Sequence, residues 1–526
     1  MISKKESIFK FLGSFNLYYF GLILLAVSLP LSPYLTSVSQ FVLAGNWILE
    51  NKFKSRFKQI KQSKSILIFL LIFFVHIVGL IYTNDFQYAF HDIKIKLPLL
   101  LLPIIIGTSQ KLNFKQLKIL LLFFIVAITV STLISTSVLL GLVNYKVTDI
   151  RDISIFISHI RFSLLINIAI FSLVYFFLLD KIKNKEKVVY LILIIWLSSF
   201  LFILQSFTGI IVFFITGFIA LIYFFNRFKN KKIKNCLIGF MIIMPIILLA
   251  LISKSIIDFY SVDKINPDTI DKYTNLGNKY KHDFNNKIIE NGHYVYLYIS
   301  EKELRNEWNK ISNIDYDSID KKGQKIKNTI VRYLTSKGYR KDAKGIKKLT
   351  KHDITLIEEG YANYIYKNKI SLPARIYKII WQIDVQFKKG NPSGHSVTQR
   401  FEYLKASFGI IKDNFLFGIG TGDLKTVFAK QYNKMNSPLS KRWRLRAHNQ
   451  FVTFFLAFGF FGFLIILFSI FFPIINEKKY TDYFLMVFLV IALLSMLNED
   501  TLETQAGVTF FSYFYSLFLF GYNRKE

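Results

Sequence analysis

Cysteine is nearly absent from this sequence of 526 residues, which has a single one at position 236. One cysteine cannot form an intramolecular disulfide, and it also excludes zinc motifs built on Cys-x-x-Cys. Neither the His-Glu-x-x-His motif nor an EF-hand calcium loop occurs. Acidic residues are scarce as well, with 34 Asp and Glu against 67 Lys and Arg. We therefore expect no disulfide framework, no metal site and no cofactor.

The excess of basic residues gives a formal net charge of +33, which would favour a nucleic-acid partner in a soluble protein. Here, however, basic clusters such as KSRFKQIKQSK at 54–64 alternate with apolar runs. Hydrophobic residues make up 52% of the chain, and several runs reach the length of about 20 residues that crosses a bilayer. Lysine-rich loops between membrane spans favour the cytoplasmic side. The charge therefore predicts membrane topology, and no nucleic acid is expected as a partner.

The apolar runs predict an all-α polytopic membrane protein with about twelve transmembrane helices. The run at 189–225 is too long for one span, so we expect it to fold back at 205–209. The short run at 97–107 counts as a span because only then do the basic loops 181–187 and 226–235 lie inside. Both termini are then cytoplasmic. The predicted spans are 11–29, 34–49, 65–82, 97–107, 117–140, 162–179, two within 189–225, 236–252, 448–474, 483–497 and 508–522.

These spans divide the chain into three predicted parts. Residues 1–252 hold the first nine spans and residues 448–526 hold the last three. Residues 253–447 are mostly polar and lysine-rich, which predicts a large, mostly helical extracytoplasmic domain between spans nine and ten. Within this domain an apolar stripe at helical spacing predicts a helix, 401–412, that lies along a membrane surface. The stripe consists of Phe401, Leu404, Phe408 and Ile411, and Lys405 and Lys412 are expected to face water.

The segment 399–459 collects most of the polar side chains that suggest a reaction. Arg400 precedes the surface helix, the run FGIIKDNFLFGIGTGD carries a glycine-rich turn and ends at Asp423, and AHNQF places His448 directly before an apolar run. This ordered set resembles the superfamily of O-antigen ligases and polymerases, bacterial glycosyltransferases that use lipid-linked glycans. The resemblance implies transfer of a glycan from undecaprenyl diphosphate to an acceptor hydroxyl, at the outer face of the bacterial cytoplasmic membrane.

Arginines are the candidates for holding the diphosphate, because the planar donors of a guanidinium match phosphate oxygens in pairs. The resemblance implies this role for Arg161 and Arg400. Arg446 is the third candidate, and with Arg442 and Arg444 it would point to one side of an extended segment. An arginine at the end of a span can equally reach out to lipid headgroups, which is the alternative reading of Arg161.

His448 is the candidate catalytic base, since imidazole can accept a proton from a sugar hydroxyl at neutral pH. It could instead cap the following membrane helix. Glu499, Asp500 and Asp423 are secondary candidates. Glu499 and Asp500 could orient the acceptor sugar, pair with the arginines, or simply form an acidic outer loop. The turn at 205–208 departs from relatives that carry a basic residue there, because its sequence is Gln-Ser-Phe-Thr.

The sequence leaves the acceptor open. A ligase would transfer to lipid A core, a polymerase to another lipid-linked repeat unit, and a protein O-oligosaccharyltransferase to a protein hydroxyl. A transporter of lipid-linked glycans is an alternative from another class. It is disfavoured because the two halves show no related pattern and almost no ionisable residue is expected in mid-membrane. The expected partners are the lipid-linked glycan, its acceptor and membrane lipid.

Overall fold

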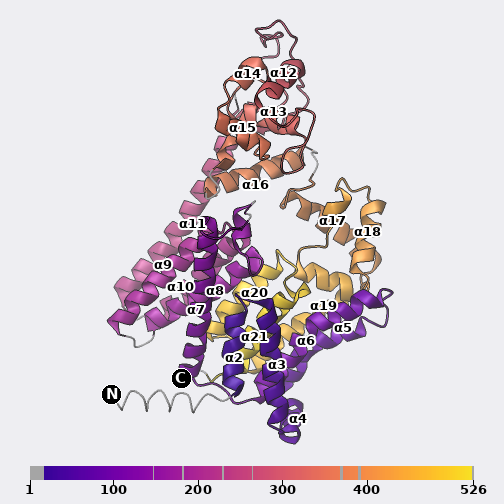
Figure 1. Ribbon diagram of the computed structural model, residues 1–526. Coiled ribbons are helices and arrows are strands. Elements are labelled where there is room, and N and C mark those ends of the chain that lie inside the picture. The colour runs from indigo at the N-terminus through magenta and orange to yellow at the C-terminus, as the bar shows by residue number, and fades with distance from the viewer. Residues whose placement is uncertain are drawn as a thin grey trace. The chain divides into compact units, whose positions relative to one another are not determined.

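The computed structural model describes most of the chain (Figure 1). The described residues are 17–145, 147, 149–179, 183–227, 230–262, 265–367, 371–388 and 392–523. They form two compact units. Unit 1 combines residues up to Leu237 with Glu402–Ser437 and the residues from Arg444 onwards. Unit 2 combines Ile238–Phe401 with Pro438–Trp443.

Unit 1 is a helical bundle in which both consecutive helices and helices far apart in sequence pack along one another. α19 lies along α5, α21 along α6, and α2 along α3 (Figure 1). Its helices are α2 (Leu17–Ser28), α3 (Pro33–Leu49), α4 (Phe53–Gln62), α5 (Lys64–Val78), α6 (Phe86–Thr108), α7 (Phe114–Leu139), η1 (Ile150–Ile153), α8 (His159–Leu179), α9 (Asn184–Ile203), α10 (Phe207–Arg227), α18 (Leu424–Lys434), α19 (Gln450–Asn476), α20 (Tyr483–Met496), η4 (Thr501–Glu503) and α21 (Gln505–Leu519).

The helices confirm an all-α membrane protein. Each predicted span coincides with a helix, although the first begins at residue 11, outside the described residues. Within the described residues, length and apolarity alone mark six helices as able to cross a membrane, and α4 with α5, bent by 89°, would make a seventh. The total of twelve therefore stays a prediction. The six are Phe114–Leu139, His159–Leu179, Asn184–Ile203, Phe207–Phe225, Lys234–Tyr260 and Gln450–Asn476.

α6 is much longer than the apolar run at 97–107 that predicted it. The helix begins at Phe86, where the side chain of Asp85 accepts a hydrogen bond from the N–H of Tyr88, and it continues through both of its prolines. Its first half contains Asp92 and Lys96, which are 6% and 0% exposed. The sequence placed the start of this helix too late because the apolar run that predicted it begins only at Leu97, after these charges.

The glycine-rich turn after α17 packs against a kink in α19. Gly459 has φ 62° inside that helix, a conformation that side chains disfavour. A Cβ atom on Gly459 would lie 2.4 Å from the carbonyl oxygen of Leu416. A Cβ atom on Gly418 would lie 2.5 Å from the carbonyl oxygen of Ala457. The two glycines thus let one backbone approach the other directly.

Main-chain hydrogen bonds join the turn to the kink. The N–H of Ile419 donates to Leu456 at 2.9 Å, and the N–H of Phe460 donates to Phe415 at 2.8 Å. The hydroxyl of Thr421 adds a bond to the carbonyl of His76 on α5 at 2.7 Å. These bonds satisfy backbone groups that the kink removes from the helical pattern.

Unit 2 has a hydrophobic core of its own, built around Trp308, Tyr333 and Leu334, each 0% exposed. The indole of Trp308 donates to the carbonyl of Ile314 at 2.8 Å, and the hydroxyl of Tyr333 donates to Asp353 at 2.6 Å. Short helices, irregular segments and one small hairpin surround this core. The elements are β1 (Ile289–Glu290), β2 (His293–Tyr294), α12 (Glu301–Ile311), α13 (Ile326–Ser336), α14 (Ala343–Lys347), α15 (Lys351–Glu358), η2 (Tyr364–Lys367), α16 (Leu372–Phe387) and η3 (Lys441–Trp443).

Two helices pass from one unit to the other, namely α11 (Lys231–Tyr260) and α17 (Thr398–Asp413). α17 matches the predicted surface helix closely. Phe401 and Phe408 are 54% and 63% exposed, and Lys405 is exposed beside them. Ala406 and Ile410 are buried on the opposite face. An exposed face of aromatic and lysine side chains suits a membrane interface, and its position at a membrane stays a prediction.

We predict that Gly459→Ala strongly destabilises unit 1, because both the positive φ and the contact with Leu416 oppose a Cβ atom. The melting temperature of the purified protein in detergent should fall. Gly45→Ala on α3 is the matched control, since nothing lies within 4 Å of its added Cβ. An unchanged melting temperature for Gly459→Ala would contradict the account of the kink.

Candidate functional site

His448 lies immediately before α19 and adopts φ 49°, the left-handed region. It does not cap the helix. Asn449 does so, since its side chain accepts a hydrogen bond from the N–H of Val452 at 3.0 Å. The amide of Asn449 also donates to the carbonyl of Leu497 at 2.8 Å. The cap therefore fixes the start of α19 against the end of α20 and leaves the imidazole of His448 for another role.

The imidazole of His448 lies between a carboxylate and an aromatic ring. Its Nδ1 is 3.6 Å from Oε2 of Glu499, close enough for electrostatic attraction but longer than a hydrogen bond. The ring of Tyr403 stacks on it at 5.4 Å between centroids. A carboxylate beside Nδ1 favours the tautomer with a proton on Nδ1, so that Nε2 can accept one. This arrangement is the one expected of a base that a carboxylate orients.

Asp500 holds the main chain at His448. Its carboxylate accepts a hydrogen bond from the N–H of His448 at 3.2 Å and one from the hydroxyl of Thr453 at 2.7 Å. The side chain is buried, and this burial raises the pKa of Asp500, while Arg446 lowers it and Glu503 raises it. Asp500 therefore links the 498–504 loop to the first turn of α19.

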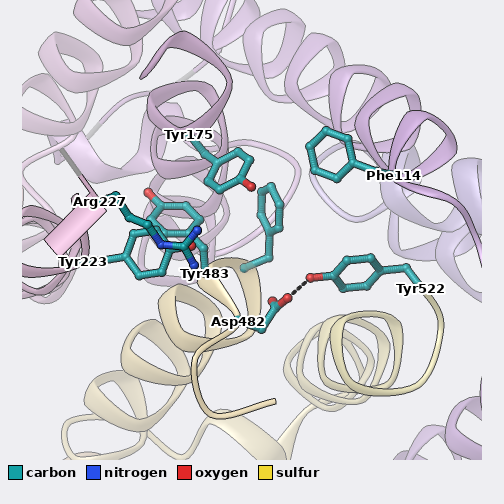
Figure 2. Close-up of a pocket in the computed structure, with 8 residues that line it drawn as sticks. Phe114, Tyr175, Tyr223, Arg227, Asp482, Tyr483 and Tyr522 are labelled. Carbon is teal, nitrogen blue, oxygen red and sulfur yellow. Dashed lines mark hydrogen bonds between the residues drawn. The ribbon is translucent and has the colours of Figure 1, made fainter. Parts of the chain in front are cut away.

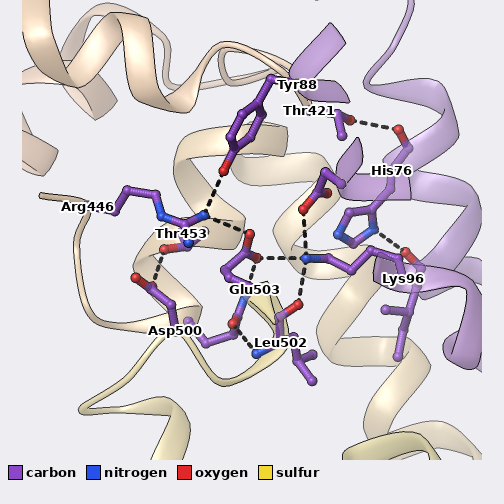
Figure 3. Close-up of polar contacts among 12 residues, drawn as sticks. His76, Tyr88, Lys96, Thr421, Arg446, Thr453, Asp500, Leu502 and Glu503 are labelled. Carbon is purple, nitrogen blue, oxygen red and sulfur yellow. Dashed lines mark hydrogen bonds and ion pairs between the residues drawn. The ribbon is translucent and has the colours of Figure 1, made fainter. Parts of the chain in front are cut away.

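Arg446 reaches the same loop from the irregular segment before His448 (Figure 3). Its Nη1 donates to Oε2 of Glu503 at 3.0 Å and to the hydroxyl of Tyr88 at 3.2 Å. The side chain keeps 27% of its surface exposed. Arg446 is thus anchored on one side by protein partners and remains accessible on the other.

Lys96 is the cation at the centre of this network and was not among the candidates predicted from the sequence (Figure 3). Its ammonium group donates to Asp92 at 3.1 Å, to Glu503 at 3.1 Å and to the carbonyl of Leu502 at 2.6 Å. The side chain is 0% exposed. The available signal was the i, i+4 spacing of Asp92 and Lys96, which pairs charges on one helix face.

Glu503 is shared between the two cations. Burial opposes its ionisation, but Lys96 and Arg446 outweigh burial and hold the pKa of this carboxyl below its usual range. Gln450 in the first turn of α19 adds a donor to Glu503 at 3.1 Å and accepts from the N–H of Leu502 at 2.7 Å. The ionised Glu503 therefore connects α6, the 498–504 loop and α19.

Arg161 lies in the first turn of α8, close to the same loop. It lines one small cavity together with Thr501, and the carboxylate of Glu499 interacts with it electrostatically. Its Nη1 is 3.3 Å from the hydroxyl of Ser158, whereas its Nε is buried without a hydrogen-bond partner among the described residues. A buried donor of this kind suits an anionic ligand.

The turn at 205–208 has no basic residue, in contrast to the expectation from the family resemblance. Its polar side chains have structural partners instead. The hydroxyl of Thr208 accepts a hydrogen bond from Asn498 at 2.6 Å, next to the site. The hydroxyls of Ser206 and Ser163 are 3.0 Å apart. Gln205 has φ 51° and is buried. These residues hold α8, α10 and the 498–504 loop together.

The remaining arginine candidates do not share one direction. Arg444 donates to Asn433 at 2.6 Å, away from the partners of Arg446. Arg442 lies in η3, and its guanidinium is 5.3 Å from the ring of Trp443. Arg400 lies in the first turn of α17 and belongs to unit 2. The expectation that 442, 444 and 446 form one extended row is therefore wrong, because η3 interrupts the row.

Asp423 has a structural role in unit 1. Its carboxylate accepts hydrogen bonds from the N–H groups of Asn84 at 3.0 Å and Asp85 at 2.8 Å, and from the side-chain amide of Asn84 at 2.8 Å. The side chain is 4% exposed. It fixes the loop between α5 and α6, which could not be inferred from the sequence alone.

A second polar cavity, of about 30 Å³, lies at the opposite end of α20 (Figure 2). Tyr175, Tyr223, Arg227 and Asp482 are among its lining residues. Asp482 accepts a hydrogen bond from the hydroxyl of Tyr522 and caps α20. The 14 residues of α20 separate this cavity from the 498–504 loop by about 20 Å. It is therefore not part of the site at His448.

In the part of the chain that the structure describes, no group of three or more His, Cys, Asp or Glu residues could hold a metal ion. The carboxylates around His448 instead have lysine, arginine, amide or hydroxyl partners.

We predict that Lys96→Met destabilises unit 1 by about 3–5 kcal/mol, because the change leaves Asp92 and Glu503 buried beside each other without their shared cation. The double variant Lys96→Met with Asp92→Asn should recover part of the loss. The control is Lys94→Met, an exposed lysine of the same helix. Thermal unfolding in detergent measures all three, and equal melting temperatures for the variants at 94 and 96 would contradict the central role of Lys96.

Comparison with known proteins addresses the same segment. Residues 356–467 match the family model described as O-antigen ligase, a range that includes Arg400, Asp423, Arg446 and His448. No curated protein sequence matches the chain. The family match supports a membrane glycosyltransferase of the O-antigen ligase and polymerase type. It also confirms the resemblance seen in the sequence, because the match over residues 356–467 supports an O-antigen ligase superfamily assignment.

Proposed function

We propose that this protein is a glycosyltransferase of the O-antigen ligase type, which moves a glycan from a polyprenyl diphosphate, undecaprenyl diphosphate in bacteria, to an acceptor hydroxyl. The observation that carries the proposal is His448, which lies in the family-matched segment with the carboxylate of Glu499 beside its Nδ1. We further propose that the reaction occurs at the outer face of the cytoplasmic membrane, with both termini of the chain inside.

The proposed reaction is a single displacement at the anomeric carbon. Nε2 of His448 takes the proton of the acceptor hydroxyl as that oxygen attacks. A bond forms between the acceptor oxygen and the anomeric carbon, and the bond from this carbon to the diphosphate breaks, with inversion. The polyprenyl diphosphate leaves with the electron pair. Because the leaving group is already activated, the reaction needs neither a nucleotide sugar nor a metal.

Negative charge grows on the diphosphate as it leaves, so the proposed stabilising groups are guanidinium ions. Arg161 offers a buried Nε and Arg446 an accessible face, and both come close to the 498–504 loop. Guanidinium has five N–H donors, so Arg446 can bind phosphate oxygens while its Nη1 remains on Glu503. For Arg400 the same role stays a prediction from the sequence.

The acidic residues have distinct proposed roles. Glu499 orients the imidazole of His448 and stabilises its protonated form after the proton transfer. Asp500 fixes the main chain of His448, and Glu503 positions Arg446. We propose no contact between Asp423 and the substrate, because its carboxylate is occupied by Asn84 and Asp85.

Ligase, polymerase and protein transfer differ in the acceptor that receives the glycan. A strain that lacks this protein distinguishes a ligase from a polymerase. For a ligase, we expect full-length glycan chains to remain on the lipid carrier, because only their transfer to lipid A core is lost. For a polymerase, single repeat units should accumulate instead. Electrophoresis of the carrier-linked and surface glycans measures both. Normal surface glycans in the deletion strain would contradict the proposed function.

We predict that His448→Ala leaves binding of a polyprenyl-diphosphate glycan nearly unchanged but lowers single-turnover transfer by about 10²- to 10⁴-fold, as expected for loss of a base. Arg161→Lys should instead weaken donor binding, because an ammonium group lacks the planar donor pair. His91→Ala, an exposed histidine on α6, is the control. Transfer at the parental rate by His448→Ala would assign the base to another residue.

A further inference from the structure

Unit 2 contains an open groove that the proposed reaction does not use. Its volume is about 460 Å³, within the range of about 300–1,000 Å³ that is typical of ligand sites. Val262 and Ile265, which follow α11, line one part of the groove. The other lining residues lie within 283–297, the segment that contains the hairpin of β1 and β2. Aromatic and aliphatic side chains line it together with polar ones, and the residues that matter here are Asp283, Phe284, Asn286, Lys287, Tyr294 and Leu297.

The aromatic ring of Phe284 lines this groove and is not part of the hydrophobic core of unit 2. Its side chain is 45% exposed. The imidazole of His282 stacks on it with an interplanar angle of 22° and a centroid distance of 5.9 Å. His282 is itself fixed, because its Nδ1 accepts from the N–H of Tyr298 at 3.2 Å and its Nε2 therefore donates to the carbonyl of Asp271 at 3.1 Å. The ring of Phe284 thus has a fixed neighbour on one side.

Polar groups with unused hydrogen-bonding capacity lie beside this ring. Oδ1 of Asp283 accepts from the N–H groups of Asn285 and Asn286 at 3.1 and 3.3 Å. Its Oδ2 has no hydrogen-bond partner within the described part of the chain. Oδ1 of Asn286 accepts from the N–H of Ile288 at 3.3 Å, which leaves the two amide hydrogens as donors. Lys287 adds a cationic donor.

We propose that this groove binds a glycan, with the C–H face of a sugar ring on Phe284 and sugar hydroxyls on Asp283 and Asn286. The proposal rests on the proposed function, because both substrates of that reaction carry glycans. The negative face of an aromatic ring attracts the weakly positive C–H groups of a sugar, and fixed polar groups select its hydroxyls.

Other ligand classes fit the groove less well. A lipid chain would desolvate Asp283 and Lys287 without pairing them. An anionic ligand would meet the carboxylate of Asp283 next to the ring. A peptide that adds to a strand edge needs a longer strand than β1 and β2, which have two residues each and pair with each other.

The test uses the full chain in nanodiscs and, as the probe, oligosaccharides of one to four repeat units released by mild acid from the surface polysaccharide of the host bacterium. Isothermal titration measures binding. Phe284→Ala should weaken binding by about tenfold, the effect of losing one aromatic contact. Asp283→Asn should also weaken it, and because asparagine keeps the acceptor at Oδ1, this variant tests the groove even if Phe284→Ala unfolds. Tyr273→Ala is the control, an exposed aromatic residue of unit 2 outside the groove.

Parental affinity in both groove variants, or no binding of these oligosaccharides by the parent protein, would overturn the proposal. Failure of the proposed function is a separate result. It would show as no transfer of glycan from polyprenyl diphosphate by the parent protein, whatever the oligosaccharides do at the groove.

Discussion

The buried ammonium group of Lys96 is the interaction on which the candidate site depends. It contacts the carboxylate of Asp92 on its own helix, α6, and a carboxylate and a main-chain carbonyl of the 498–504 loop, which lies about 400 residues away in the sequence. The loop that it holds carries Asp500, which in turn binds the main chain of His448. A buried cation is costly unless it is paired, so these partners have to be in place together. The position of the histidine is therefore coupled to the packing of α6.

Much of the helical architecture could be predicted from the sequence, because membrane helices need long apolar runs and the turn at 205–209 interrupts one of them. From the charges of the loops, the start of α8, the start of α19 and the end of α20 could also be assigned to the same side of the membrane. This assignment predicted that Arg161, His448 and Asp500 lie on one side. In the structure Arg161 and His448 both lie close to the 498–504 loop, which contains Asp500, whereas the side of the membrane stays a prediction.

Other features depended on contacts between distant segments. Asp92 and Lys96 precede the apolar run at 97–107, and nothing local in the sequence shows that Glu503 lies beside them. The alternative reading of His448 as the cap of α19 is wrong, because Asn449, a residue type preferred at this position, makes the cap. The bond from Asp423 to Asn84 spans more than 300 residues, so no local pattern could reveal it.

The contact between Gly418 and Gly459 is made by main chain on both sides. The bonds that join the two segments also connect only N–H and carbonyl groups, for example from Ile419 to Leu456. The two missing side chains at Gly418 and Gly459 thus let the backbones of the turn and α19 meet, and the rings of Phe415 and Phe460 stack beside this join. Phe417 and Phe461 are 64% and 51% exposed, and their rings contact each other at 5.9 Å between centroids, so the close approach of the two backbones also brings an aromatic pair together on the surface.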